Sequence, residues 1–377
     1  MLKVGIFVED ISYGGGLEIV SSRLYQAFCD RNIDVCIITL RQKTHKYKFL
    51  GKLHSFDFDV KDLRSKKIRT TVAKELKSLG FTHIIFQTGA PYSFFSNNAF
   101  YKAVKSSGIK TYVVFHTSPK TVVVRSYHQG ELFFEFVLRC LKTWLYNIPR
   151  SLYFFFNSSD AVDSFVTLSR GTRKELQKYF RKDSVIIPNY FEYLDFSFDL
   201  TKKKKEFVYI GRMDKEQKNI FYLINAWKNV KDKNGWKFIV IGPDSNDKDI
   251  LKALNENEIE TVFYADNKKV LEILRESSVL LLASIYEGFP TVVLEAVANA
   301  NAVITTRYDG FSDEIIRNNK NGFVIDNKLN SKEFTKAIEK LIDDKALLLS
   351  MQKKSIDLYQ EYTRTDVVEL WKKEFEK

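Results

Sequence analysis

Continuous apolar runs alternate along this chain with stretches whose apolar residues recur at helical spacing. The first run, Lys3 to Val8, leads through the glycine-rich turn Ser12 to Gly16 into Leu17 to Cys29, which has one apolar helical face. Strands that are apolar throughout are typical of a parallel sheet covered by helices on both faces. The pattern therefore predicts an α/β protein. Further strands in the first half are predicted at Asp34 to Leu40, His83 to Phe86, Thr111 to Phe115 and Phe165 to Leu168.

The second half repeats this alternation after an irregular, lysine-rich segment. Its predicted strands are Phe207 to Ile210, Lys237 to Ile241, Thr261 to Tyr264, Val279 to Ala283, Ala302 to Thr306 and Gly322 to Ile325. Its predicted helices include Asn219 to Asn229, Lys268 to Glu276, Thr291 to Asn299 and Ser331 to Asp343, and Thr363 to Lys377 reads as an amphipathic tail helix.

This repetition predicts two Rossmann-like domains facing a central cleft, where the strand ends of such sheets bind ligands. We place the N-terminal domain at residues 1–190, a linker at 191–205 and the C-terminal domain at 206–360. The last segment, 361–377, is expected to be a helix that returns to the N-terminal domain.

Charge distinguishes the two halves more than composition does. The 377 residues are 45% hydrophobic, as in a globular protein, and the net charge is +12. Residues 1–190 hold 29 Lys and Arg against 15 Asp and Glu, whereas the remainder holds 30 against 32. This asymmetry indicates a polyanionic partner, either nucleic acid or an anionic membrane. The N-terminal segment does not have the pattern of a signal peptide, so we expect a cytoplasmic protein.

The most informative stretch is Glu287-Gly-Phe-Pro-Thr-Val-Val-Leu-Glu295, which follows a predicted strand and opens a helix near Pro290. Free N–H groups at a helix start attract anions. The two carboxylates, Glu287 and Glu295, can accept hydrogen bonds from vicinal sugar hydroxyls. They would stand two helical turns apart if the helix covers the span.

A second stretch, Tyr209 to Asn219, follows the first strand of the second half. Gly211 permits a tight turn at the strand end. Arg212 and Lys218 can converge on a diphosphate and neutralise the leaving group, a task that Mg²⁺ performs in other enzymes. The two stretches together predict a nucleotide-sugar site.

These motifs resemble those of the retaining family 4 glycosyltransferases, which have the GT-B fold. The resemblance covers nearly the whole chain, and the Glu287/Glu295 pair, which matches the Glu-x₇-Glu signature, is its most specific mark. One departure is Asn299 to Ala302, where many members carry Gly and Pro. Further matches are Gly15-Gly16-Leu17-Glu18, Phe115-His116-Thr117, Val166 to Ser169, Ile187-Pro188-Asn189 and Tyr308 to Ile316.

The resemblance implies that the domain of residues 1–190 binds the acceptor and that of residues 206–360 binds the nucleotide-sugar. It also implies a role for each matching residue. Glu287 binds donor-sugar hydroxyls, with the N–H groups of Phe289 and Thr291 nearby, and Glu295 binds the ribose. His116 contacts the donor sugar or supports the reacting centre. Gly15 and Gly16 approach the diphosphate and the acceptor, Arg212 and Lys218 hold the diphosphate, Val262 and Phe263 lie beside the base, and Gly288 and Pro290 complete the donor site. Attack on the same face as the leaving phosphate would make catalysis mainly a matter of positioning and charge stabilisation. We name no base, nucleophile, cofactor or metal.

Three other functions were weighed. A dehydrogenase is disfavoured because Gly14-Gly15-Gly16 is not Gly-x-Gly-x-x-Gly and the second strand ends without an acid. A nucleic-acid-binding protein rests only on the basic half, and a non-catalytic sugar-binding subunit is disfavoured by the intact site motifs. The Asp57-Phe-Asp59 and Asp247-Lys-Asp249 sequences have metal-site spacing but read as solvated acids.

The partners expected are a nucleotide-sugar, with UDP favoured, and a saccharide or lipid-linked saccharide acceptor of bacterial surface-polysaccharide assembly. Between Lys120 and Phe156, basic residues stand beside clustered aromatics. This mixture suits an interfacial helix on anionic lipid, or alternatively a buried helix pair. We favour peripheral association with the inner face of the membrane and expect no nucleic-acid partner.

Overall fold

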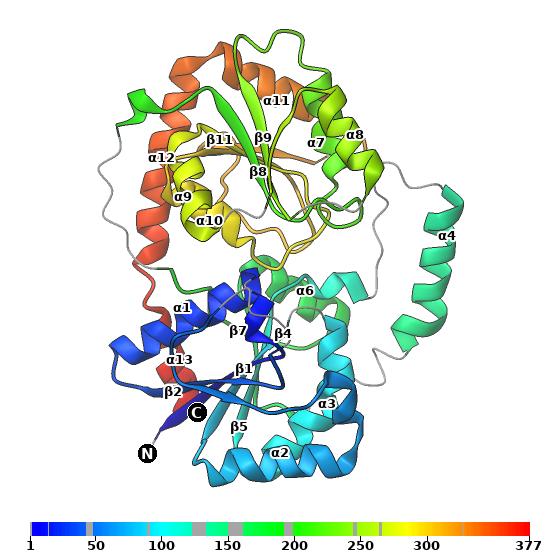
Figure 1. Cartoon of the computed structure of the whole chain (residues 1–377), viewed down its shortest axis with the longest axis vertical. Coiled ribbons are helices and arrows are strands. Elements are labelled where there is room, and N and C mark those ends of the chain that lie inside the picture. Colours follow the sequence, from blue (N-terminus) through cyan, green and yellow to red (C-terminus); the bar gives the residue numbers. More distant parts are fainter. Residues whose placement is uncertain are drawn as a thin grey trace. The chain divides into compact units, whose positions relative to one another are not determined.

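The computed structural model describes residues 2–13, 15–42, 48–88, 91–122, 133–149, 161–191, 199–243, 247–263, 266–326 and 328–377. The chain forms two compact units. Unit 1 comprises Met1–Arg125, Arg139–Phe191 and Asp366–Lys377, and unit 2 comprises Ser126–Leu138 and Glu192–Thr365. Each has one parallel sheet flanked by helices (Figure 1). The two Rossmann-like domains predicted from the sequence are therefore confirmed, whereas the cleft expected between them stays a prediction.

Unit 1 has a seven-stranded sheet in the order β3-β2-β1-β4-β5-β6-β7, with every strand pair parallel. Its strands are β1 Lys3–Val8, β2 Asp34–Thr39, β3 Leu53–Ser55, β4 His83–Thr88, β5 Lys110–Phe115, β6 Ser164–Thr167 and β7 Val185–Ile186. Five of these match predicted runs, and the short edge strands β3 and β7 were not predicted.

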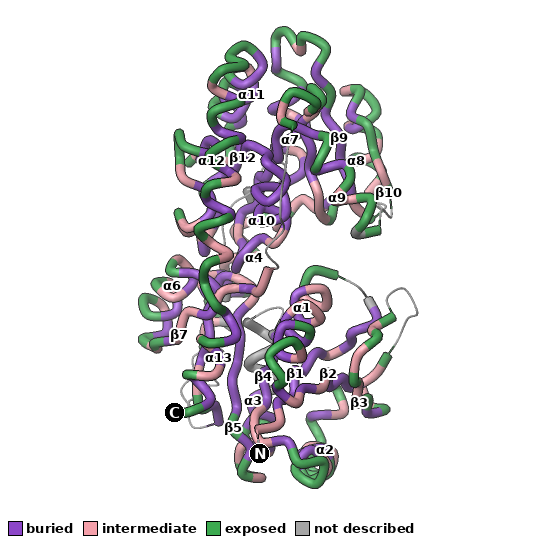
Figure 2. Tube along the Cα trace, turned by 90° about the vertical axis from the view of Figure 1, so that its left-hand side faces the viewer, coloured by how far each residue is buried: buried purple, intermediate pink, exposed green. Residues whose placement is uncertain are grey.

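The helices of this half are α1 Gly16–Asp30, α2 Lys66–Ser78, α3 Pro91–Ser106, α4 Phe133–Lys142 and α6 Arg170–Phe180, with α13 Val367–Phe375 added from the end of the chain. Short helical turns lie at Ile11–Tyr13, Val60–Arg64, Pro119–Val122 and Thr143–Asn147. Figure 2 shows burial along the central strand β1, whose last five residues are buried.

The C-terminal helix α13 belongs to unit 1, as expected. The Phe375 ring packs against Phe28 and Tyr112 at centroid distances of 6.1 and 5.4 Å. The helix begins at Val367, not at Thr363, because Asp366 caps it by accepting from the Glu369 N–H at 3.0 Å. Residues 361–363 end the preceding helix instead.

Unit 2 has a six-stranded parallel sheet in the order β10-β9-β8-β11-β12-β13. Its strands are β8 Glu206–Ile210, β9 Lys237–Gly242, β10 Glu260–Phe263, β11 Val279–Leu282, β12 Ala302–Thr306 and β13 Gly322–Ile325. Its helices are α7 Ile220–Lys228, α8 Lys248–Glu256, α9 Asn267–Glu276, α10 Thr291–Ala298, α11 Lys332–Asp343 and α12 Lys345–Thr363.

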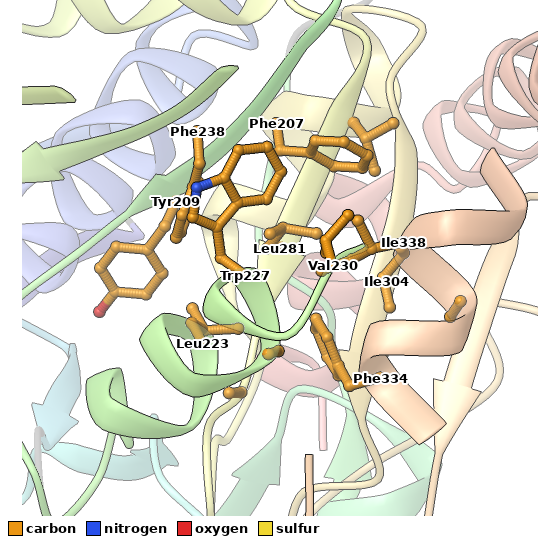
Figure 3. Packing of buried hydrophobic residues seen from close by; sticks show 14 of the residues in the cluster. Phe207, Tyr209, Leu223, Trp227, Val230, Phe238, Leu281, Ile304, Phe334 and Ile338 are labelled. Atoms are coloured by element: carbon orange, nitrogen blue, oxygen red, sulfur yellow. The ribbon is translucent and has the colours of Figure 1, made fainter. Parts of the chain in front are cut away.

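The order of this sheet reverses between β8 and β11, because the chain passes outward through β9 and β10 and then returns. In an open α/β sheet, the carboxyl ends of the strands at such a switch point bind ligands. An apolar core with Trp227 at its centre packs α7 and α11 against strands β8 and β11 (Figure 3). The loops that follow these two strands therefore begin from well-packed positions.

Part of the expected linker belongs to unit 2. The Lys203 ammonium donates to the Ser277 carbonyl at 2.6 Å, and the Lys204 backbone N–H donates to the Glu276 carbonyl at 2.7 Å. Both lysines are thereby fastened to the end of α9. Residues 192–198 of the expected linker and Tyr264 of a predicted strand lie outside the described residues.

Candidate active site

The loop after β8 presents Lys218 through a turn that Asp214 organises. The Asp214 carboxylate accepts from the backbone N–H groups of Gln217 at 2.7 Å and Lys218 at 2.9 Å. Asn219 then adopts a left-handed conformation, with φ of 54°, at the N-cap of α7. This turn fixes the Lys218 backbone at the switch point of the sheet.

Gly211 and Gly242 let the chain pass closely at this strand end. Gly211 has φ of 153°, and a Cβ atom on Gly242 would lie only 2.2 Å from the Gly211 carbonyl oxygen. A backbone oxygen cannot give way as a flexible side chain can. Glycine is therefore required at position 242 for the neighbouring loops to pass each other.

Lys218 and Glu287 meet across the switch point. The Lys218 Nζ atom lies 2.5 Å from Glu287 Oε1, with 14% and 9% of the two side chains exposed. The Ser284 hydroxyl donates to the same carboxylate oxygen at 2.6 Å. The predicted cation and acid thus occupy one site, and the carboxylate direction is set by two donors.

Arg212 belongs to the same loop but has different partners. Its guanidinium donates to Gln217 Oε1 at 2.6 Å and lies 3.7 Å from Asp214 Oδ2. With 64% of the side chain exposed, it is accessible to an incoming anion. Its convergence with Lys218 on a diphosphate stays a prediction.

Helix α10 begins after Glu287, not at it. Pro290 is the N-cap and Thr291 the first helical residue, so Glu287 lies in the preceding loop and only Glu295 lies on the helix. The helix start predicted at Thr291 is thereby confirmed, whereas the two-turn spacing, which required the helix to cover Glu287, does not apply. Proline cannot occupy a helix interior without loss of a hydrogen bond, which explains the late start. Glu287 is instead held by its loop, as its contacts show.

The surroundings of α10 are largely buried. Gly288, Pro290 and Glu295 are buried, and the Phe289 ring stacks on Tyr362 of α12 at a centroid distance of 5.8 Å. The first-turn N–H groups of Thr291 and Val292 have no carbonyl four residues back within the helix. Binding of an anion by these N–H groups beside Glu287 stays a prediction.

The residues expected beside the base lie on the edge strand β10. Val262 is half-buried and Phe263 is exposed. An exposed aromatic ring at a strand end offers a surface for stacking, but contact with a base stays a prediction for both residues.

Gly15, Gly16 and His116 lie in unit 1, so their approach to the donor stays a prediction. Gly15 is the N-cap of α1, and Gly16 opens this helix. His116 Nε2 lies 2.5 Å from Gln87 Oε1, at the end of β5. Loss of solvation lowers the pKa of His116 to about 3, so the ring is neutral at neutral pH.

Two residues that contribute to the site, Ser284 and Lys328, were not singled out from the sequence, and a third, Asp309, was named only within the matching segment Tyr308 to Ile316. Ser284 could have been found as the first polar residue after a buried strand. Lys328 carries no local signal, because it reaches the Glu287 loop only through the fold. The Lys328 ammonium donates to the Ile285 carbonyl at 2.9 Å and lies 3.2 Å from Asp309 Oδ1.

The two Asp-x-Asp sequences have structural roles. Asp59 accepts from the Arg41 guanidinium at 2.9 Å, and Asp247 caps α8 and lies 2.7 Å from the Lys215 ammonium. Within the described ranges, no group of three or more His, Cys, Asp or Glu side chains is arranged to hold a metal ion.

Residues 191–357 match the family model described as "Glycosyl transferases group 1". The chain is 24% identical over 356 residues to the amylovoran biosynthesis glycosyltransferase AmsD of Erwinia amylovora, covering 92% of each chain.

Two solved structures share the fold. TarM of S. aureus, solved with Fondaparinux, alpha-GlcNAc-glycerol and UDP, has a TM-score of 0.74 at 14% identity, with all of both chains covered. HepE of Anabaena, solved with UDP-glucose, has a TM-score of 0.69 at 12% identity, covering 98% of this chain and 96% of that one.

The fold and these similarities define the class: the chain is a glycosyltransferase with the GT-B fold. Within that class, residues 191–357 are similar to the domain of the group 1 glycosyl transferases.

Proposed function

We propose that this enzyme is a retaining, metal-independent glycosyltransferase that moves a sugar from a UDP-sugar to a saccharide or lipid-linked saccharide. The observation that carries the proposal is the contact of Lys218 with Glu287 at the switch point of unit 2. One group suits a phosphate and the other suits sugar hydroxyls. A diphosphate-sugar has both chemical features in one molecule.

Each residue then has a defined task. The Lys218 ammonium and the exposed Arg212 guanidinium neutralise the diphosphate as it departs, together with the N–H groups that open α10. Glu287 accepts from hydroxyls of the donor sugar, and its carboxylate is already oriented by Ser284. The acceptor hydroxyl attacks from the face that the phosphate leaves, and the departing phosphate oxygen takes its proton. The rate then depends on position and charge stabilisation, with no protein nucleophile.

The donor and pathway are proposed from similar proteins. TarM was solved with UDP and HepE with UDP-glucose, which supports UDP as the leaving group. AmsD is named for amylovoran biosynthesis, which supports a place in surface-polysaccharide or glycoconjugate assembly.

The test is a panel of nucleotide-sugars, scored for hydrolysis and for thermal stabilisation of the protein. We expect a UDP-sugar to give both signals, and Glu287→Ala and Lys218→Ala each to abolish turnover. Lys354→Ala is the matched control, because Lys354 forms an exposed ion pair with Asp357 on α12 and should leave turnover unchanged. Turnover that survives Glu287→Ala or Lys218→Ala would remove that residue from the site.

A lipid-linked acceptor requires the enzyme to reach a membrane, and α4 with the turn after it suits this task. Its exposed large apolar side chains recur at helical spacing: Phe134, Leu138, Leu141, Trp144 and Leu145. Arg139 and Lys142 lie in its last turn, within the half of the chain that holds the positive charge. Apolar side chains beside basic ones match the interface of an anionic bilayer. Within the described ranges, no helix is long and apolar enough to cross the bilayer.

Flotation with vesicles of phosphatidylglycerol and phosphatidylcholine tests this part separately. We expect binding that weakens as salt rises and is lost in the double variant Leu138→Ser, Leu141→Ser. Hydrolysis of the free nucleotide-sugar should persist in that variant. A wild-type protein that does not float with anionic vesicles would contradict membrane association and leave the transferase proposal standing.

A further inference from the structure

Lys328 follows β13 and reaches the loops that follow two other strands. Its ammonium donates to the carbonyl of Ile285, in the loop after β11, at 2.9 Å. It also lies 3.2 Å from the carboxylate of Asp309, in the loop after β12. Only 17% and 11% of the Lys328 and Asp309 side chains are exposed. A largely buried ion pair thus contacts the loop that bears Glu287.

The backbone of Asp309 forms hydrogen bonds with two residues of that loop, Ile285 and Glu287. Its N–H donates to the Ile285 carbonyl at 2.8 Å, and its carbonyl accepts from the Glu287 N–H at 2.9 Å. The Ile285 carbonyl therefore accepts from both Asp309 and Lys328. The position of Asp309 is thus linked by a hydrogen bond to the backbone of Glu287, whose carboxylate contacts Lys218.

The same arrangement includes the loop that carries Lys218. The Asn219 amide donates to the Lys328 carbonyl at 3.3 Å. The backbone N–H of Ile285 donates to the Gln217 carbonyl at 2.8 Å, and the Gln217 amide donates to the Tyr286 carbonyl at 3.3 Å. The loops after β8, β11, β12 and β13 are thereby connected at one edge of the sheet.

A buried ion pair usually adds little to the stability of a protein. Removing two charges from water is costly, and apolar residues of similar volume often serve a protein's stability as well or better. The Lys328 ammonium, by contrast, has directed contacts to one carbonyl and one carboxylate, which define a position. Positioning within a fraction of an ångström is what a site working by orientation requires.

We propose that Lys328 and Asp309 form a positioning pair that sets the carboxylate of Glu287 against the sugar of the donor. The inference rests on the proposed function, in which Glu287 binds that sugar. Lys328 acts through Asp309 and Ile285 and touches neither the donor nor the reacting atoms. The pair therefore determines how well the sugar is oriented, while the nucleotide is held by other groups.

The test uses the full-length protein and the UDP-sugar that the wild-type enzyme hydrolyses fastest in the panel. The variants are Lys328→Met, Lys328→Arg and the control Lys354→Met, each alone and in the Glu287→Gln background. Turnover is measured as kcat/KM, and UDP binding is measured by calorimetry. Methionine keeps the length of the lysine stem without its charge, whereas the arginine fork can still donate to a carbonyl and a carboxylate.

We expect Lys328→Met to lower kcat/KM by about 10- to 100-fold, since a displacement of ~1 Å near the reacting groups can cost about 100-fold. The affinity for UDP should stay within about twofold, and Lys328→Arg should restore much of the turnover. Unlike Glu287→Ala, Glu287→Gln should keep a residual turnover, because its amide oxygen can still accept from sugar hydroxyls. In this background, Lys328→Met should have little further effect on that residual turnover, because both changes act on one contact. Lys354→Met should match the wild type.

Two results would refute the positioning role of Lys328 and Asp309. The first is an unchanged kcat/KM in Lys328→Met. The second is an equal loss of kcat/KM in the wild-type and Glu287→Gln backgrounds together with weaker UDP binding, which would indicate general damage to the site. Should Lys328→Met fail to fold, Asp309→Asn carries the same test, because it removes the negative charge that pairs with Lys328 while keeping the size of the side chain. A wild-type protein that hydrolyses no nucleotide-sugar would refute the proposed function and this inference with it, whereas normal turnover in the variants refutes the pair alone.

Discussion

Replacing Glu287 by glutamine removes one negative charge and changes no heavy-atom position. In the wild-type protein, the Glu287 carboxylate lies 2.5 Å from the Lys218 ammonium and accepts from the Ser284 hydroxyl at 2.6 Å. The amide oxygen of glutamine can keep the contact with Ser284. The Lys218 ammonium, however, loses its counter-charge in a place where only 14% of its side chain meets solvent.

The size of the effect depends on burial. Removing one partner of a buried ion pair costs about 3–5 kcal/mol, because an uncompensated charge is left away from water. We take the lower end, about 3 kcal/mol, since Lys218 keeps some access to solvent and a neutral oxygen remains beside it. For a unit of about 150–250 residues, 1 kcal/mol shifts Tm by about 2–4 °C, which gives a fall of about 6–12 °C.

The structure provides a matched control for the measurement. Lys204 and Glu276 are also 2.5 Å apart in unit 2, but 54% and 56% of their side chains are exposed. Exposed pairs contribute about 0–1 kcal/mol, so Glu276→Gln should scarcely change the unfolding of this unit. Urea denaturation and calorimetry of both variants, without ligand, give the comparison. Equal losses of stability in Glu287→Gln and Glu276→Gln would refute the argument that burial, not distance, determines the strength of the pair.

Three further outcomes are expected. Gly242→Ala should destabilise unit 2 by about 1–3 kcal/mol or more in urea unfolding, because its Cβ would lie 2.2 Å from the Gly211 carbonyl oxygen; a wild-type midpoint would contradict the close approach. Arg212→Ala should leave Tm within about 1 °C, as an exposed side chain allows, and weaken UDP binding about 10-fold or more in calorimetry; unchanged affinity would remove Arg212 from the site. The pKa of His116 is lowered to about 3 in the folded state, below its unfolded value of about 6.5, so between these values the unfolded chain binds more protons and stability rises with pH. The wild-type protein should accordingly lose stability as the pH falls from 6.5 toward 3, and His116→Phe should lose less in urea unfolding between pH 4 and 7; parallel profiles would show that the ring does not titrate in this way.

The central strands were predictable because a strand that is buried on both faces is apolar along nearly its whole length. All five residues of β12 are buried, and the predicted run Ala302 to Thr306 coincides with it. The edge strands β3 and β7 are only three and two residues long, and their pairing is determined by the neighbouring strand. No local pattern of so few residues distinguishes a strand from a loop.

The proximity of Lys218 and Glu287 was predictable because each residue lies in a loop that follows a central strand, whereas their binding of a donor stays a prediction. Lys218 and Glu287 lie in the loops after β8 and β11, and the reversal of strand order brings them together. The contacts of Lys328 were not predictable in the same way. The contacts of Lys328 with Asp309 and Ile285 span loops that only the folded sheet brings together.

The position of α13 has a consequence for how this protein is made. Its Phe375 and Trp371 rings pack on Tyr112, and Asp366 pairs with Arg31, so the final helix completes a domain whose other strands and helices end at Phe191. During translation, the rings of Phe28 and Tyr112 stay uncovered by α13 until all of unit 2 has been synthesised. A ribosome stalled before residue 366 would therefore hold a chain that contains all of unit 2 but lacks the last helix of unit 1. A fragment ending at Phe191 should need the α13 sequence, in trans or by fusion, to remain in solution.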